Sequence, residues 1–300
     1  MPDAALTAGE ARSRHRLGLA MVTASAIFWS SGGFFTRLIP LDLWTMLAWR
    51  GLFGGLSILL FMAWDARAPG RRRLWRPMGW PGLIVMLLNT GGMLLFIGSL
   101  RLTAVADVTV IYAILPFLTA PIAWLWFKER PTRRTMLAGL LALGGVVITV
   151  GGALGHGGSS LLGCFLAFVM TTTMALTTSI TRRYPGVPMI QAACLACFAG
   201  SAICFPMAGP ASGITALDFV NLALFGILNM GLGLALYVMG AKHIPAAEAA
   251  LLSILETPVA PLWVWIFFAE VPRGATLLGG AVVLFAVLWQ VLGSRQHRSA

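Results

Sequence analysis

Charged residues are scarce in this 300-residue chain: Asp, Glu, Lys and Arg make up only 10% of it, whereas 58% is hydrophobic. Soluble domains carry about 25% charged residues. A surface that faces water cannot be built from such a composition, and no polar segment is long enough to fold separately. The composition therefore excludes a water-soluble enzyme or binding module and favours an integral membrane protein.

Residue types that carry out catalysis or bind metals are also scarce. The chain has four histidines, four cysteines and ten acidic residues, with no H-E-x-x-H motif and no nucleophile–base set. Cys194 and Cys197 form a C-x-x-C, but they lie in an apolar stretch without a histidine or carboxylate neighbour, which disfavours metal or redox chemistry. We expect no enzymatic activity, no cofactor and no bound metal.

The chain is built instead from ten apolar stretches of about 20 residues, the length that crosses a hydrocarbon core about 30 Å thick as an α-helix. The connections between them are short. We predict an all-α integral membrane protein with polar tails at residues 1–16 and 294–300. The predicted helices cover residues 17–39, 44–64, 81–100, 105–127, 135–153, 159–180, 188–208, 217–241, 246–268 and 275–293.

The net charge of +11 could indicate nucleic-acid binding, but the placement of the basic residues indicates membrane orientation instead. With the first tail in the cytoplasm, 17 of the 21 Lys and Arg residues fall in cytoplasmic segments and three fall outside, while Arg50 lies within the second predicted helix. Membrane proteins show this excess of positive charge on the cytoplasmic side. We therefore predict a multi-pass protein with both termini in the cytoplasm and no nucleic-acid partner.

The chain also repeats itself at an offset of 140 residues. Segments 88–121 and 228–261 align without a gap and coincide at nine positions, which include Asn89 with Asn229. Predicted helices three to five thus resemble helices eight to ten, and the chain divides into two five-helix halves. The halves cover residues 17–153 and 159–293.

Because five is an odd number, the second half must cross the membrane in the opposite sense to the first. The charge pattern agrees: the basic loop at 128–134 corresponds to a loop whose only positive residue is Arg273. Inverted repeats are typical of transporters, whose substrate site lies near the bilayer midplane between the halves. We expect the two halves to surround a midplane cavity.

Two segments resemble the paired signatures of a known family. "TVIYAILPFLTAPIAWLWFKERPTRRTMLAGLLALGGVVI" and "ALLSILETPVAPLWVWIFFAEVPRGATLLGGAVVLFAVL" are similar to EamA-type exporters of the drug/metabolite transporter superfamily, and the arginine in "LAWRGLFGGLSILL" fits the same pattern. Within that superfamily, "IFWSSGGFFTRLIP" is similar to the YddG-type exporters of aromatic and other amino acids. The resemblance implies outward transport of small metabolites across a bacterial inner membrane.

Polar side chains near the middle of the predicted spans form the candidate substrate site, because polar groups are costly in hydrocarbon. Helices 135–153 and 275–293 have almost nothing polar at this depth, so we expect them to pack outside the others. The chain has only three tyrosines, and two of them lie in the repeated segments. The expected substrate-binding residues are Trp29, Ser30, Ser31, Asn89, Tyr112, Asn229, Tyr237 and Glu256.

Most of these residues also fit structural roles. Serine and threonine in membrane helices commonly bond their own helix carbonyls, which applies above all to the threonines at 171–173. Asn89 and Asn229 could clamp helices across the pseudo-two-fold axis, and Tyr237 suits an interfacial aromatic belt. Glu256 could hold a substrate ammonium, exchange a proton during transport, or be protonated and structural.

Five further residues are expected to have structural or gating roles. Arg50 lies about 9 Å of helical rise from the start of its span, shallow enough for its side chain to reach the interface, so it is an anchor or a carboxylate contact. Pro116, Pro121, Pro258 and Pro261 each remove a backbone donor near the middle of a predicted helix. Such breaks suit a hinge or a cavity lined by polar backbone, and kinked packing is the alternative.

Hydroxyls, amides and aromatic faces with few charges suit a small zwitterion, whereas a phosphorylated substrate would need several deep cations. We therefore predict an exporter of amino acids of broad range, aromatic ones included, that works by alternating access. The alternative is a proton-coupled exporter of hydrophobic cations that uses Glu256. The expected partners are the small-molecule substrate and membrane lipids, and the pathway is compatible with a monomer.

Overall fold

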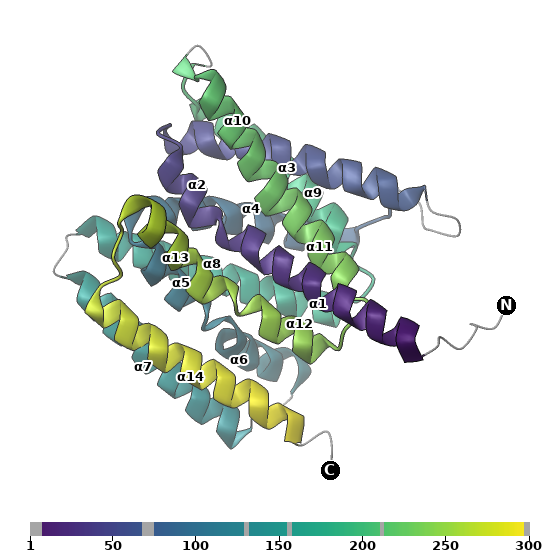
Figure 1. Ribbon diagram of the computed structural model, residues 1–300, viewed down its shortest axis with the longest axis vertical. Helices are drawn as coiled ribbons and strands as arrows, with labels where there is room; N and C mark the ends of the chain where they lie inside the picture. Colours follow the sequence, from purple (N-terminus) through teal and green to yellow (C-terminus); the bar gives the residue numbers. More distant parts are fainter. Residues whose placement is uncertain (1–7, 68–74, 129–131, 155–157, 211–212, 297–300) are drawn as a thin grey trace.

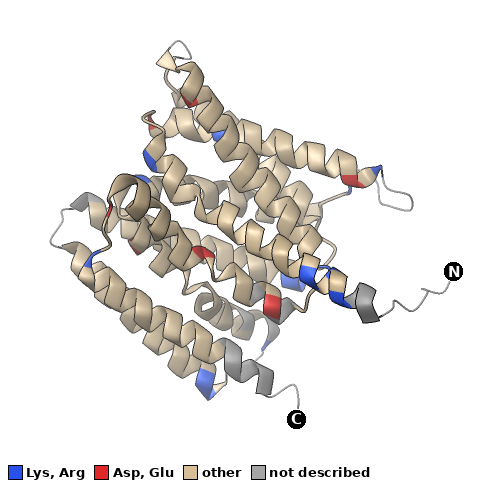
Figure 2. Ribbon diagram, viewed as in Figure 1, with Lys and Arg blue, Asp and Glu red and all other residues tan. Residues whose placement is uncertain are grey.

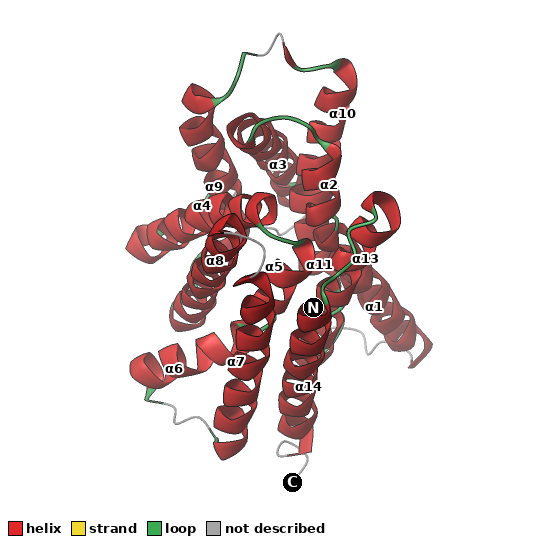
Figure 3. Cartoon of the chain, turned by 90° about the vertical axis from the view of Figure 1, so that its left-hand side faces the viewer, coloured by secondary structure: helices red, strands yellow, loops and turns green. Residues whose placement is uncertain are grey.

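The computed structural model of the chain describes residues 8–67, 75–128, 132–154, 158–210 and 213–296. All regular elements in these ranges are helices, so the predicted all-α fold is confirmed (Figures 1 and 3). Nine described segments are long and apolar enough to cross a membrane, and the tenth predicted span contains the shorter apolar helix Gly274–Gln290. Part of each predicted tail, and the predicted cytoplasmic arginines at 71–73 and 130, lie outside the described ranges.

The helices follow the predicted spans, although the first one starts earlier, inside the predicted tail. Figure 2 shows the charged residues mostly near the helix ends. In chain order the elements are α1 (Ala8–Ser30), α2 (Gly32–Leu38), α3 (Leu43–Ala66), α4 (Gly79–Leu102), α5 (Val105–Tyr112), α6 (Leu115–Phe127), α7 (Arg133–Ala153), α8 (Gly158–Arg183), α9 (Met189–Cys204), the 3₁₀-helix η2 (Phe205–Met207), α10 (Ala216–Leu224), the π-helix η4 (Phe225–Leu232), α11 (Gly233–Gly240), α12 (Ala246–Ser253), α13 (Glu256–Phe268) and α14 (Gly274–Gln296).

Three of the ten predicted spans are interrupted by residues that belong to no helix. The first span is interrupted at Ser31, between α1 and α2. The fourth breaks at residues 113–114, between α5 and α6, and the ninth breaks at residues 254–255, between α12 and α13. Broken membrane helices leave backbone groups without helical partners, and such backbone is tolerated where it is buried in protein or lines a cavity.

The two halves repeat the break in the same form. Helices α5 and α12 have eight residues each, and α6 and α13 have thirteen each. Lys128 follows α6 and Ala269 follows α13, and both adopt a left-handed backbone, with φ of 58° and 54°. Because a non-glycine residue rarely adopts positive φ, this shared ending shows that the sequence repeat is also a structural repeat.

Two of the four expected mid-helix prolines are placed differently from the prediction. Pro121 and Pro261 lie inside α6 and α13, as expected. Pro116 is the second residue of α6 and Pro258 the third of α13, positions whose N–H groups have no partner within the helix. The expectation that these two interrupt a continuous helix is therefore wrong, because the interruption precedes them.

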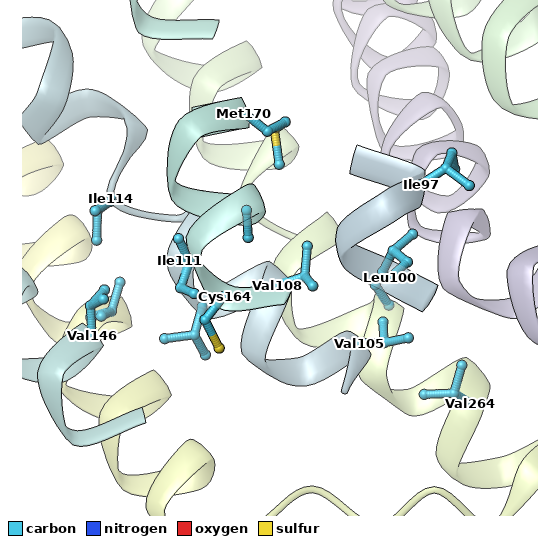
Figure 4. Close-up of a cluster of buried hydrophobic side chains, with 14 of the residues drawn as sticks. Ile97, Leu100, Val105, Val108, Ile111, Ile114, Val146, Cys164, Met170 and Val264 are labelled. Carbon is cyan, nitrogen blue, oxygen red and sulfur yellow. The ribbon is translucent and has the colours of Figure 1, made fainter. Parts of the chain in front are cut away.

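The centre of the bundle is an apolar core built around the short helix α5. Val105, Val108 and Ile111 of α5 are fully buried. Figure 4 shows them packed among side chains of α4, α8, α7 and α13, which include Leu100 and Cys164. Both halves contribute to this core, so the short helix before the break is held by its neighbours and not by its own length.

Helices α7 and α14 form a separate pair on the side of the bundle, as the sequence predicts for its fifth and tenth helices (Figures 1 and 3). The pair crosses at Gly145 and Gly279. A Cβ atom added to Gly145 would lie 2.6 Å from the carbonyl oxygen of Gly279 and 2.8 Å from the Val283 side chain. Only glycine allows the two backbones to approach this closely, as at other small-residue contacts between membrane helices.

This crossing gives a matched test, because the neighbouring Gly144 has no atom within 4 Å of an added Cβ. We expect Gly145→Ala to lower the thermal unfolding midpoint of the detergent-purified protein by about 5 °C, since overpacking a tight contact costs about 1–3 kcal/mol. Gly144→Ala should leave the midpoint unchanged or raise it slightly. Unfolding of both variants is followed by tryptophan fluorescence. Equal midpoints for the two would contradict the close approach of α7 and α14.

Candidate functional site

The broken helices of the two halves meet inside the bundle. Helix α1 packs against α11, α12 and α13, while α13 packs against α5 and α2 (Figure 1). The interruptions in the first, fourth and ninth spans therefore belong to one group of contacting helices. This is the part of the molecule in which the sequence analysis expects the substrate site.

Four of the eight expected substrate-binding residues come together there. The rings of Trp29, from α1, and Tyr237, from α11, have centroids 5.2 Å apart. The hydroxyl of Tyr112, the last residue of α5, lies within electrostatic range of Tyr237 and of Glu256, the first residue of α13. All four side chains are half-buried. We call Trp29, Tyr112, Tyr237 and Glu256 the aromatic–acid cluster.

Glu256 supplies the acidic group of this cluster. Among the described residues, its carboxylate has no hydrogen-bond or ion-pair partner. Its position at the start of α13 places it at the positive end of the helix dipole, which favours a negative charge by a modest amount. A half-buried carboxylate that interacts with Tyr112 is suited to an organic cation or an ammonium group, because both a carboxylate and an aromatic ring face attract positive charge.

The two expected serines are used within the structure. The Ser30 hydroxyl is buried, donates to the Ile27 carbonyl at 2.7 Å and accepts from the Trp263 indole N–H at 2.9 Å. The Ser31 hydroxyl donates to the Phe28 carbonyl at 2.6 Å. Both therefore stabilise the end of α1, and the Trp263 bond joins that end to α13.

The local-bond alternative for the threonines of α8 is confirmed. Thr171, Thr172 and Thr173 donate to the carbonyls of residues 167, 168 and 170 of their own helix. Such bonds satisfy the hydroxyl inside the helix that carries it. These three residues therefore give no sign of a substrate contact.

The two repeat-related asparagines differ in their surroundings. Asn229 is buried in η4, where its amide N–H donates to the carbonyls of Phe28 and Trp29 at 3.0 Å each. Asn89 is half-buried in α4 and has no hydrogen-bond partner among the described residues. Asn229 thus clamps η4 to the end of α1, whereas Asn89 remains open to a ligand. The π-helical turns of η4, a feature often found at functional sites, carry this clamp.

The position of Arg50 contradicts the expectation that its side chain reaches the interface. Arg50 is fully buried, donates from Nη2 to Oδ1 of Asn229 at 2.9 Å, and lies over the Phe225 ring with Cζ 4.4 Å from the centroid. Helical rise gives depth along the axis but not the direction in which a side chain points. Here the side chain points across to η4 and not towards the membrane surface.

One end of the bundle is held by two ion pairs that each join the two halves. Arg37 of α2 pairs with Glu270 at 2.8 Å, and Arg273 pairs with Asp107 of α5 at 3.2 Å. We call these four residues the latch. Glu270 also accepts from the Val105 N–H at 3.0 Å, which fixes its carboxylate to the start of α5.

The sequence analysis did not identify the latch, although opposite charges at the ends of spans from different halves were a usable signal. Asp107 is fully buried and also accepts from Thr276 at 2.6 Å and from Thr103 at 3.0 Å. The latch therefore closes this end with polar contacts from both halves. It lies at the end of the bundle where the odd-numbered predicted spans finish.

The opposite end is hollowed between α4, α6 and α8. A cavity of about 500 Å³ opens there, and its walls are largely apolar. The cavity is lined by Trp80, Ile84, Leu88, Trp126, Leu176, Ile180, Arg183 and Tyr184. A second hollow, of about 360 Å³, lies at the other end beside the latch and includes Arg37, Glu270 and Arg273 in its lining.

Comparison with known proteins agrees with this two-half architecture. The model of the EamA-like transporter family matches the chain twice, at residues 16–151 and 161–292. A solved structure described only as "Crystal structure of protein" is similar in fold, with a TM-score of 0.62, 20% sequence identity, and coverage of 95% of this chain and 98% of its own. No curated protein matches the chain. The two family matches cover most of the sequence, and the chain therefore belongs to the EamA-like transporter family.

Proposed function

We propose that the protein exports small zwitterionic metabolites, chiefly amino acids of broad range including aromatic ones, across a bacterial inner membrane. Its family makes it a multi-pass membrane transporter of small molecules and not an enzyme. The aromatic–acid cluster is the observation that carries the proposal. Glu256 with the tyrosines would receive the substrate ammonium, and the faces of Trp29, Tyr112 and Tyr237 would pack an apolar side chain.

The charge distribution supports a substrate that carries little net charge. Arg50 is the only Lys or Arg among the described residues that is buried, and it donates to Asn229. The described part of the chain therefore has no group of buried cations. Phosphorylated sugars and nucleotides need several such groups, because each phosphate oxygen must be paired inside the membrane. Amino acids need one partner for each of their two charges.

Alternating access is the proposed mechanism. In this proposal the latch lies on the outer side and the 500 Å³ cavity on the cytoplasmic side, in agreement with the positive-inside pattern, and the ion pairs of the latch hold the two halves together on the outer side. Export would then require the latch to separate while the cytoplasmic end closes. The breaks beside Ser31, Tyr112 and Glu256 lie at the cluster itself, where a hinge would couple binding to the rocking of the two halves.

The second candidate is a proton-coupled exporter of hydrophobic cations. The observation that favours it is the Glu256 carboxylate, which interacts with Tyr112 and has no hydrogen-bond or ion-pair partner among the described residues, since a carboxylate that exchanges a proton for a cation needs no fixed partner. Both candidates use the same cluster. They differ in whether a substrate carboxylate contributes to binding.

Binding to the purified protein separates the two candidates. Radiolabelled phenylalanine and threonine are compared with tetraphenylphosphonium in a scintillation proximity assay, with Tyr112→Ala as the site variant. Saturable binding of both amino acids, weakened at least about tenfold in Tyr112→Ala, is the expected result. Saturable binding of tetraphenylphosphonium without either amino acid would favour the cation exporter. The matched control is Phe285→Ala, because Phe285 is an exposed aromatic residue of α14 that lies outside both the cluster and the cavity.

A further inference from the structure

Arg50 is a buried cation whose bonding is incomplete. It is fully buried in α3, and only its Nη2 atom has a hydrogen-bond partner, Oδ1 of Asn229 at 2.9 Å. Nε and Nη1 have none among the described residues. No acidic side chain pairs with it, and the Phe225 ring at 4.4 Å is its other attractive contact. The guanidinium therefore lacks most of the compensation that a buried charge requires.

Arg37 shows how this chain bonds an arginine that holds structure together. All three of its guanidinium nitrogens are used: they donate to the Glu270 carboxylate and to the carbonyls of Leu100 and Thr103. Arg50 lies deeper than Arg37 and has fewer partners, although burial makes missing partners more costly. A purely structural role gives no reason for two unpaired nitrogens in the interior.

The location of Arg50 connects it to the aromatic–acid cluster. Asn229 accepts from Arg50 and at the same time donates to the carbonyls of Phe28 and Trp29, at the end of α1. Trp29 itself belongs to the cluster. A shift of α1 at its break, next to Ser31, would therefore disturb the contacts of Asn229, the residue that holds Arg50.

We propose that Arg50 binds the substrate carboxylate during transport and that Asn229 is its positioning residue. The inference rests on the proposed amino-acid function. Glu256 and Arg50 form no ion pair with each other, so each charge is left for one end of a zwitterion. A guanidinium can bind a carboxylate through two parallel hydrogen bonds from neighbouring N–H groups. Asn229 takes only one of the two hydrogens of Nη2, so the other hydrogen, together with an unpaired neighbouring nitrogen, is available for such a pair of bonds.

Three related compounds test this division of roles. Phenylalanine has both charges, phenethylamine has only the ammonium, and 3-phenylpropionate has only the carboxylate. Their affinities for the wild type and for both variants are measured by direct binding of each labelled compound. We expect Arg50→Gln to lose at least about tenfold in affinity for the two compounds with a carboxylate and to keep phenethylamine. Glu256→Gln should lose at least about tenfold in affinity for the two compounds with an ammonium and keep 3-phenylpropionate.

A second variant keeps the test valid if Arg50→Gln does not fold. Asn229→Asp places a carboxylate next to Arg50, but it also removes the N–H donor to the carbonyls of Phe28 and Trp29. The internal pair should offset part of that loss of stability and should compete with a substrate carboxylate, so phenylalanine affinity should fall at least about tenfold and phenethylamine affinity much less. Unchanged phenylalanine affinity in a folded Asn229→Asp protein would overturn the inference. Equal losses for phenylalanine and phenethylamine in Arg50→Gln would also overturn it, but would leave the amino-acid function intact. A wild type that binds only phenethylamine would refute the proposed function as well.

Discussion

Glu256→Gln is expected to lower phenylalanine counterflow in proteoliposomes at least about tenfold. The substitution keeps the shape of the side chain but removes the charge that faces Tyr112 and lacks a partner of its own. A hydrogen bond to a charged group contributes about 1.5–3 kcal/mol more than its absence, which corresponds to a factor of about 10 to 100 in affinity. Counterflow reports the loss of substrate affinity directly, because it needs substrate binding and turnover but no ion gradient.

Glu248→Gln is the matched control for that variant. Glu248 lies in α12, the other half of the same broken span, and its carboxylate pairs with His15 at 3.3 Å near the surface. A surface pair of this kind contributes about 1 kcal/mol or less, so counterflow should stay close to wild type. Full counterflow in a folded Glu256→Gln protein would show that Glu256 is structural and would remove it from the substrate site.

Breaking the latch is expected to expose the interior at the closed end. Glu270→Gln removes the charge that pairs with Arg37, and the native Cys164 reports the result because it is buried, with Sγ 3.9 Å from Oγ1 of Thr103. In a protein whose other three cysteines are replaced by alanine, we expect a polar maleimide to label Cys164 at least about tenfold faster in Glu270→Gln. Mass spectrometry of the detergent-purified protein follows the rate.

Asp42→Asn controls for a general loosening of that end. Asp42 accepts from the N–H groups of Trp44 and Thr45 at 2.9 Å each and caps α3 without joining the two halves. Burial tends to raise its pKa, but these hydrogen bonds outweigh that effect and hold the pKa below its usual value. Asparagine can still cap the helix, so labelling of Cys164 should not change. Equal labelling rates in wild type and Glu270→Gln would mean that the latch does not hold this end closed.

Much of the fold could be predicted because membrane crossing constrains sequence strongly. Each span needs about 20 apolar residues, and the repeat around Asn89 and Asn229 divides the chain into halves. The prolines indicated breaks in the fourth and ninth spans but not their positions. The break at Ser31 and the π-helix η4 had no comparable signal, because their geometry depends on contacts with distant helices.

The residues of the site that are identified by their depth in the membrane could be predicted from the sequence. The contacts that depend on the direction in which a side chain points could not. Trp29, Tyr112 and Glu256 lie well inside apolar spans, and the structure brings them together with Tyr237, which lies nearer the end of its span. For Arg50 the sequence left an interfacial anchor and a carboxylate contact open, because it gives the depth of the residue but not its partner, Asn229, which lies 179 residues further along the chain. The latch was missed for the same reason, since Arg37 and Glu270 are 233 residues apart.

The most direct test of amino-acid export is flux through the purified protein in liposomes. Uptake of radiolabelled phenylalanine and threonine is measured with and without an imposed pH gradient, alongside uptake of tetraphenylphosphonium. The proposed function predicts protein-dependent uptake of both amino acids down their concentration gradients in either condition. Uptake of tetraphenylphosphonium driven by the pH gradient, with no movement of either amino acid, would contradict it and establish a cation exporter instead.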